Sequence, residues 1–198
     1  MQAWVNLTAH SITQSTPNTI MNKPVDTPFI QDDRIPYQKP QPWGMAPDLV
    51  INDALDGDER MWAPIGENIW SRPLHLNANA GYYVHLLKVK RSGLLQRHRH
   101  SGTVHAWVIR GKWHYLEHDW VATEGSYIFE PPGETHTLVV PDDCTDMITL
   151  FNVQGALMYV DPQGNSTGYD DVFTRIDKYR AHFESIGLGA DYVKRFMR

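Results

Sequence analysis

The spacing of hydrophobic and polar residues changes along the chain and divides it into three stretches. Between about residues 60 and 162, short runs rich in β-branched and aromatic residues are interrupted by Gly, Pro, Asn or Asp about every 8 to 12 residues. Each run has room for one strand and each interruption for one turn, which is typical of an antiparallel sandwich or barrel. We expect strands near Trp70–Leu76, Tyr82–Lys90, Gly93–His98, His105–Arg110, Lys112–His118, Ser126–Phe129, His136–Val140, Met147–Val153 and Ala156–Val160.

A different period follows the loop Asp161–Gly168. The next apolar residues recur at spacings of four, three, four and three, which predicts one face of a helix with Asp170 and Asp171 near its N-terminal end. A shorter helix through Tyr192, Val193 and Phe196 should follow. The residues of the longer helical face are Val172, Ile176, Tyr179, Phe183 and Ile186.

The N-terminal stretch shows neither period. Six of the thirteen prolines fall between residues 24 and 47, which predicts an extended arm that lies across its own barrel or a neighbouring subunit. Phe29, Tyr37 and Trp43 would make the contacts, and a disordered tail is an equally good interpretation of the first 25 or so residues. We therefore expect an arm over residues 1–55, a barrel over 56–165 and helices packed on the barrel over 166–198.

Composition narrows the function classes. Eighteen basic against 23 acidic residues give a net charge of −5, and without a basic block this argues against a nucleic-acid partner. Apolar runs reach only about six residues, far short of the roughly 18 of a membrane span, so no membrane partner is expected. The first residues also lack the pattern of a secretory signal. We expect a globular, cytoplasmic protein.

Four of the ten histidines have a spacing that suits a metal site. His98 and His100 are two residues apart, so both imidazoles leave the same face of a strand. His105 follows five residues later, and His136 follows a tight Pro-Pro-Gly turn. Taken singly, each histidine is more commonly a satisfied core or surface residue.

Two longer segments contain these histidines and resemble the paired motifs of the cupin superfamily. Gly93–Gly111 (GLLQRHRHSGTVHAWVIRG) has the glycine, the HxH pair and the closing glycine of the first motif. Gly125–His136 (GSYIFEPPGETH) matches G(x)5PxGxxH, about 13 residues further on. The resemblance implies an all-β cupin jelly-roll barrel in which His98, His100 and His136 hold a divalent metal.

The chain departs from the cupin pattern at two positions. His105 stands where most metal-binding cupins carry a glutamate ligand, and Val140 stands in place of an asparagine. Imidazoles alone would leave the double charge of the metal uncompensated, which favours an anionic, bidentate substrate. His105 is then either a fourth ligand or a neighbour of the three ligands.

Four segments carry a closer likeness: Arg97–His100, Gly111–Asp119, Glu130–Thr137 and Gly187–Val193. Over about residues 55 to 198 the chain resembles the 2,4′-dihydroxyacetophenone dioxygenase family, which is related through its three-histidine iron site to acetylacetone-cleaving dioxygenases. The resemblance implies an Fe(II) enzyme that uses O2 to cleave a carbon–carbon bond of an aromatic α-hydroxyketone such as 2,4′-dihydroxyacetophenone. An aromatic carboxylate and formate are the products.

Such a reaction needs a base close to the metal. Glu130 directly precedes the turn of the second motif and could point into the barrel mouth, although a surface glutamate at a strand end is nearly as good an interpretation. Tyr115 could donate a hydrogen bond to a phenol or ketone, or could be a plain core tyrosine. The expected catalytic residues are therefore Glu130, Tyr115 and His105.

Other functions fit the same residues. A related β-diketone-cleaving dioxygenase is one, and a non-redox zinc cupin acting as a hydrolase, isomerase or ligand sensor is another. We expect a homodimer or homotetramer, because cupins usually pair through their sheets and the arm could embrace a partner.

Overall fold

The computed structural model describes residues 35–198 and divides the chain into two units, Met1–Met45 and Ala46–Arg198. Residues 35–45 of the first unit form neither helix nor strand. Phe29 and the tail expected over residues 1–25 lie outside the described residues. Residues 46–55, which we expected to belong to the arm, fall in the second unit.

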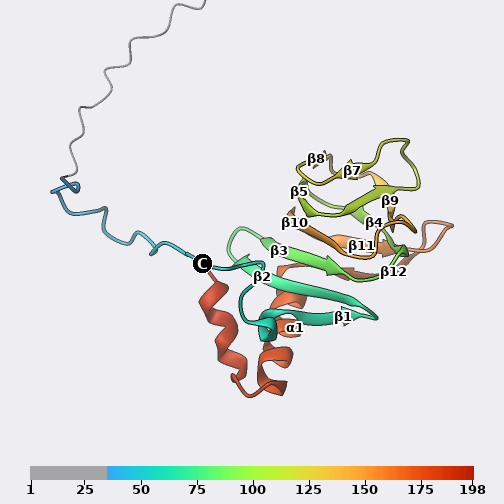
Figure 1. Ribbon diagram of the computed structural model, residues 1–198. Helices are drawn as coiled ribbons and strands as arrows, with labels where there is room; N and C mark the ends of the chain where they lie inside the picture. Colours follow the sequence, from blue (N-terminus) through green and yellow to red (C-terminus); the bar gives the residue numbers. More distant parts are fainter. Residues whose placement is uncertain (1–34) are drawn as a thin grey trace, which may run out of the picture. The chain divides into compact units, whose positions relative to one another are not determined.

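The second unit is built on two six-stranded sheets (Figure 1). Their strand orders are β1-β2-β3-β10-β5-β8 and β12-β11-β4-β9-β6-β7, so strands that neighbour each other in sequence often lie in different sheets. All paired strands are antiparallel, as the pattern predicted. The strands are β1 (Ala63–Gly66), β2 (Ile69–Asn77), β3 (Tyr82–Val89), β4 (Gly93–His100), β5 (Val104–Arg110), β6 (Lys112–Tyr115), β7 (Ala122–Thr123), β8 (Tyr127–Glu130), β9 (Thr135–Val140), β10 (Met147–Gln154), β11 (Leu157–Val160) and β12 (Ser166–Asp170).

All nine strands expected from the sequence are confirmed, and three further strands were missed. β1 and β7 are too short for a period-two pattern to show. The third is β12, which we had assigned to a loop and the start of the helical stretch. That assignment is wrong: the polar, glycine-containing run pairs with β11 and forms the edge of its sheet.

The predicted long helix is confirmed as α1 (Val172–Ser185). It begins after Asp171, whose carboxylate accepts hydrogen bonds from the backbone N–H groups of Phe173 and Thr174. The shorter helix is the 3-10 helix η2 (Ala190–Phe196), and a further turn, η1 (Glu59–Met61), precedes β1. α1 lies beside β1, β2 and η2 (Figure 1). No helix among residues 35–198 is long and apolar enough to cross a membrane.

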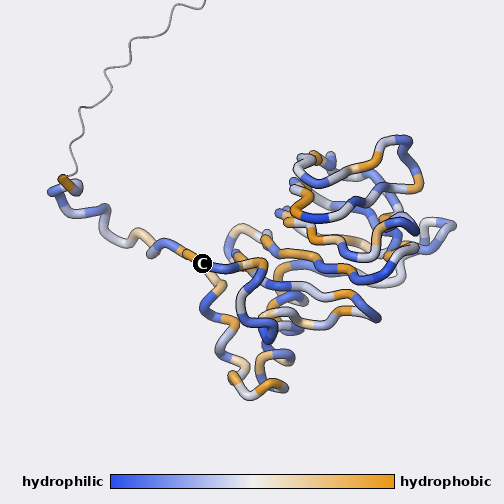
Figure 2. Tube along the Cα trace, in the orientation of Figure 1, coloured by the Kyte–Doolittle hydropathy of each residue, from blue (hydrophilic) through white to orange (hydrophobic). Residues whose placement is uncertain are grey.

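Apolar side chains gather in two places because strand residues alternate between faces. Figure 2 shows hydrophobic and hydrophilic residues alternating along the strands. The main core fills the space between the sheets and extends under α1. Trp113, Tyr83 and Phe183 belong to it and are fully buried. A smaller cluster of Trp62, Leu86 and Ile148 includes the outer-facing side chains of β3 and β10.

Candidate metal centre

Three of the predicted ligands, His98, His100 and His136, come together inside the barrel. His98 and His100 lie on β4 and both are buried, while Arg99 between them is exposed. His136 lies on the adjacent strand β9 directly opposite His98 in the register. The ring centres of the three imidazoles are 4.7 to 4.8 Å from one another. Strand alternation and antiparallel pairing are therefore enough to assemble the triad.

The turn of the second motif fixes the far side of the triad. Gly133 has a φ of 91°, which favours glycine, and its backbone N–H donates to the carbonyl of His100 over 2.8 Å. This bond ties the β8–β9 turn to the end of β4. As a result, Glu130 before the turn and His136 after it both lie beside His100.

Burial keeps two of the imidazoles neutral. Burial, and to a smaller extent the neighbouring His100, lower the pKa of His98 to about 3. The pKa of His136 falls to about 2, first through burial and then through His98 and His100. A neutral imidazole has a free nitrogen lone pair at neutral pH, which is the form that binds metals.

Glu130 adds a carboxylate from the opposite sheet. Its side chain is only 3% exposed, and its Oε2 lies 2.7 Å from His100 Nε2 and 3.5 Å from His136 Nε2. The expectation that Glu130 points into the barrel agrees with this position. The expectation that the site lacks a carboxylate disagrees with it. Glu130 on β8 supplies the negative charge that a glutamate at position 105 supplies in most metal-binding cupins.

Tyr115 on β6 contacts both Glu130 and His136. Its hydroxyl donates to Glu130 Oε1 over 2.8 Å, and its ring stacks on His136 with centres 3.7 Å apart. Burial raises the pKa of Tyr115 well above its ordinary value, and the nearby Glu130 raises it further, so the phenol keeps its proton and remains a donor. Its hydrogen bond goes to Glu130, whereas we had considered a bond to substrate.

The arrangement fits a divalent metal. The Nε2 atoms of His100 and His136 are 2.8 Å apart, and one nitrogen from each of the three histidines lies within 4.8 Å of the others. Ligand bonds of about 2.0–2.2 Å place neighbouring donor atoms about 3 Å apart, close to the separation of the His100 and His136 nitrogens. Glu130 Oε2 is buried without a hydrogen-bond partner among the described residues, as an atom facing a cation site would be. His98, His100 and His136 could hold the ion, with the carboxylate of Glu130 beside it.

His105 does not join them. On β5 the buried residues are Val104, Ala106 and Val108, so His105 points to the opposite, outer face. There its Nδ1 lies 2.7 Å from the hydroxyl of Tyr127, and its ring lies beside Phe129. Our expectation that His105 is a ligand or a neighbour of the ligands does not fit this position. Its register partner is Phe129, while Glu130 faces inward opposite Val104.

Two residues near the centre were not expected. Glu134 lies with one carboxylate oxygen 2.9 Å from His118 Nε2 and the other 3.9 Å from His136 Nδ1. Glu134 stands two residues before His136 inside the second motif, and that proximity is the signal that could have drawn attention to it.

His98, His100 and Glu130 line a small cavity of about 40 Å³. Small-molecule sites usually measure about 300–1,000 Å³, so this cavity alone has room for little beyond an ion and a few ligand atoms. It shares Ile65, Leu87, Gln96 and Arg175 with a neighbouring pocket of about 280 Å³ that also reaches Lys178. Most of the inner wall is apolar, from residues such as Val104, Leu138, Phe151, Val153 and Leu157.

Solved structures share this architecture. An RmlC-like cupin protein from Ralstonia eutropha is 30% identical with a TM-score of 0.60, over 63% of this chain and 82% of that one. A protein of unknown function with a cupin-like fold from the same organism is 25% identical with a TM-score of 0.58, over 61% and 75%. Acetylacetone dioxygenase from Acinetobacter johnsonii has a TM-score of 0.61 over 74% and 99% but only 15% identity, which shows the fold alone.

Comparison with the curated proteins finds no match. The model of one protein family, the ChrR cupin-like domain, matches residues 52–157, which is more than half of the chain. The matched stretch includes both motifs, the three histidines of the triad and Glu130. The chain therefore belongs to the family of the ChrR cupin-like domain.

Proposed function

We propose that the protein is an Fe(II)-dependent dioxygenase that cleaves a carbon–carbon bond of an aromatic α-hydroxyketone such as 2,4′-dihydroxyacetophenone. The observation that carries this proposal is the buried cluster of three histidines and Glu130, two of whose histidines line a cavity together with Glu130. Imidazole and carboxylate donors suit iron and zinc, so the donor set is compatible with Fe(II). The fold shared with acetylacetone dioxygenase supports the reaction class.

Iron at this position would supply a site where the oxygens of the substrate and O2 meet. The chain itself supplies the proton acceptor, because Glu130 Oε2 has no hydrogen-bond partner among the described residues and can take the proton of the α-hydroxyl group. Tyr115 holds the other oxygen of that carboxylate and so fixes its direction. The apolar wall keeps bulk water away from the reacting carbons.

The size of the cavity limits how such a substrate can bind. The two oxygens of a hydroxyketone can enter the inner cavity, but its aromatic ring needs the neighbouring pocket of about 280 Å³. Gln96 and Arg175 lie in the wall that both spaces share. They would therefore contact the substrate between its chelating end and its ring.

A second function is favoured by one specific observation. Glu130 brings the donor set to four groups around a cavity of only about 40 Å³, which resembles the closed arrangement of non-redox zinc sites. In that case the domain binds Zn(II) and acts as a hydrolase, an isomerase or a ligand sensor. The two functions differ in metal and in their need for O2.

Oxygen consumption by reconstituted protein separates them. The purified chain is loaded anaerobically with Fe(II) or Zn(II) and mixed with 2,4′-dihydroxyacetophenone or acetylacetone in an oxygen electrode. We expect the Fe(II) protein to consume one O2 for each formate released from the hydroxyketone, and the Zn(II) protein and His98→Ala to consume none. Uptake with acetylacetone alone would assign a β-diketone substrate. Full Fe(II) occupancy without uptake on either compound would reject the dioxygenase.

A further inference from the structure

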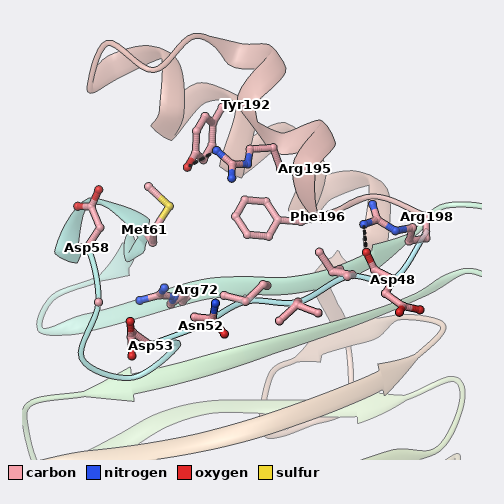
Figure 3. A pocket seen from close by; sticks show the side chains of 14 residues that line it. Asp48, Asn52, Asp53, Asp58, Met61, Arg72, Tyr192, Arg195, Phe196 and Arg198 are labelled. Carbon is pink, nitrogen blue, oxygen red and sulfur yellow. Dashed lines mark hydrogen bonds between the residues drawn. The ribbon is translucent and has the colours of Figure 1, made fainter. Parts of the chain in front are cut away.

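A second pocket of about 660 Å³ lies on the outer side of β2, where η2 faces the segment Asp48–Asp53. Figure 3 shows Tyr192, Arg195 and Phe196 on one side of it and Arg72 on the other. Its volume is in the usual range of small-molecule sites. It shares no lining residue with the cavity at the histidine triad, so it is a separate site.

Arg72 is an unusual residue for the floor of such a pocket. It is 4% exposed, and its neighbours on the outer side of the sheet are apolar, with Leu86 as its register partner on β3. Its Nε and Nη1 atoms are buried and have no hydrogen-bond partner among residues 35–198. Its guanidinium lies 5.9 Å from the centre of the Trp62 ring, and its charge is attracted by Asp58 and Glu59, neither of which forms an ion pair with it.

The acidic residues near Arg72 are paired elsewhere or exposed. Asp58 forms an ion pair with Arg60 over 2.7 Å, and Glu59 forms one with Lys88 over 2.9 Å. Asp53 is an exposed residue on the pocket wall and makes no ion pair within the described residues. A buried guanidinium without an anion in contact is costly, so this site favours an anion that comes from outside.

One nitrogen of Arg72 is placed to receive that anion. A Cβ atom added to Gly57 would lie 3.5 Å from Nη2, so Nη2 faces the small residue that lines the pocket. The same Cβ atom would lie 2.6 Å from the carbonyl oxygen of Asp53, so only glycine fits at position 57 beside the guanidinium. A ligand carboxylate is flat and has two oxygens, which match the paired N–H donors of arginine.

The other lining residues narrow the class of ligand. Arg72, Arg195 and Arg198 are balanced by Asp48, Asp53 and Asp58 on the pocket wall, which leaves no excess positive charge for a dianion such as phosphate. Met61, Phe196 and the ring of Tyr192 offer apolar surface beside the arginines. We propose that this pocket binds a small monocarboxylate with an aromatic or aliphatic body, and that Arg72 pairs with its carboxylate.

Benzoate tests this proposal on the full-length protein by calorimetry and thermal unfolding. We expect benzoate to bind with a Kd at or below about 1 mM and to raise the Tm, while its neutral analogue benzamide does neither. Arg72→Met should bind benzoate at least about tenfold more weakly, because a charged hydrogen-bonded pair is lost. The Tm of this variant without ligand should not fall, since an apolar side chain of similar length replaces an unpaired charge.

Three matched variants make the test specific. Arg180→Gln removes an exposed arginine of α1 outside the pocket and should bind benzoate like wild type. Arg72→Lys keeps the charge without the paired donors and should bind benzoate about three- to tenfold more weakly, which gives a second reading if Arg72→Met does not fold. His98→Ala should keep its benzoate affinity, because it alters only the other cavity.

Several results would overturn the proposal. The first is that wild type does not bind benzoate at 10 mM, about ten times the expected Kd. The second is that wild type and Arg72→Met bind benzoate with equal affinity. The third is that wild type binds benzamide as tightly as benzoate. Sulfate that competes with benzoate at similar concentration would assign an inorganic-anion site instead. Loss of benzoate binding in His98→Ala would place the ligand at the histidine triad.

Discussion

The inner cavity at the histidine triad and the outer pocket at Arg72 differ in size and in the pairing of their charged groups. The inner one, at the histidine triad, measures about 40 Å³, and its carboxylate contacts other polar groups: Tyr115 donates to Glu130, and Glu130 lies against His100. The outer one measures about 660 Å³, and the Nε and Nη1 atoms of its buried Arg72 have no hydrogen-bond partner among the described residues. The first arrangement gathers donors that could hold a cation, and the second presents a cation without a hydrogen-bonded anion.

This difference shows how the two sites would be selective. At the triad, the protein supplies the full set of donors and leaves little space, so the chemistry of the metal and of a small chelating group decides what binds. At Arg72, the protein supplies one half of a charged pair and a large volume, so the ligand has to bring the other half. Changes at one cavity should therefore leave the other unaffected.

The largest expected effect is the loss of metal from the triad variants. His98→Ala, His100→Ala and His136→Ala should each lower the metal content from about one ion per chain to background, because each removes one donor of a closed set. The far-UV circular dichroism should stay that of wild type, since barrel packing supplies most of the stability.

Metal analysis after reconstitution measures this effect, and His105→Ala is the matched control. His105 lies on the outer face and should keep a full complement of metal. Any of the three triad variants that retains full occupancy would lose its place in the ligand set.

The next largest effect concerns Glu130. Glu130→Gln should keep most of the metal through the three histidines and lower turnover about 10²-fold, the low end for loss of a general base. Partial recovery at higher pH, where the hydroxyketone ionises unaided, should accompany the loss. Steady-state rates between pH 6 and 9 check this, and a wild-type rate with an unchanged pH profile would remove Glu130 from the reaction.

Acid should lower the free energy of unfolding through the histidines of the inner cavity and leave ligand binding at the arginine pocket unchanged. The folded pKa values of His98 and His136, about 3 and 2, lie below the unfolded value of about 6.5. The unfolded chain therefore takes up more protons as pH falls below 6.5, and at pH 5 the metal-free protein should lose about 2 kcal/mol of unfolding free energy per histidine.

Denaturant unfolding of the metal-free protein at pH 7 and pH 5 measures this loss. The arginine pocket gives the contrast, because neither an arginine nor benzoate changes charge over this range. Benzoate affinity should stay constant between pH 7 and 5. Stability that rises toward pH 5 would contradict the neutral, buried state of both histidines.

A smaller effect is expected at Tyr115. Tyr115→Phe removes the hydroxyl that orients Glu130 but keeps the ring stacked on His136. Turnover should fall about tenfold, the value of one hydrogen bond to a charged group, with the metal content unchanged. Loss of metal from this variant would mean that the hydroxyl of Tyr115 positions the metal ligands and does not act through the base Glu130.

The smallest effect is expected at His105. His105→Glu restores the glutamate usual at this motif position, but the side chain faces outward, away from the triad. Metal content, rate and substrate affinity should all stay within about twofold of wild type, as expected for a surface substitution away from the site. A variant that binds metal more tightly or turns over slowly would show that residue 105 reaches the metal.

The inner site could be predicted from the sequence because its signals are local. His98 and His100 show their common face by spacing alone, and the Pro-Pro-Gly turn before His136 explains its return to the barrel. His105 was misplaced because its position in the motif outweighed strand alternation, although Val104, Ala106 and Val108 already mark the inward face. The homo-oligomer and the role of the arm remain predictions.

The outer pocket could not be predicted in the same way. It joins Arg72 to Tyr192 and Phe196, which lie more than a hundred residues further along the chain, and no local period relates them. Nor does a lone arginine in a strand reveal that it will lack a partner, since that depends on Asp58 and Glu59 being paired to other residues. Tertiary structure alone supplies this information.

Anomalous diffraction at the metal absorption edge, from crystals of Fe(II)-loaded protein, tests the central claim most directly. We predict one strong peak per chain, within bonding distance of a ring nitrogen of His98, His100 and His136, with the carboxylate of Glu130 facing it, and no peak near His105. A main peak between His118 and Glu134, or a peak at the triad with Glu130 turned away from it, would contradict this account of the site.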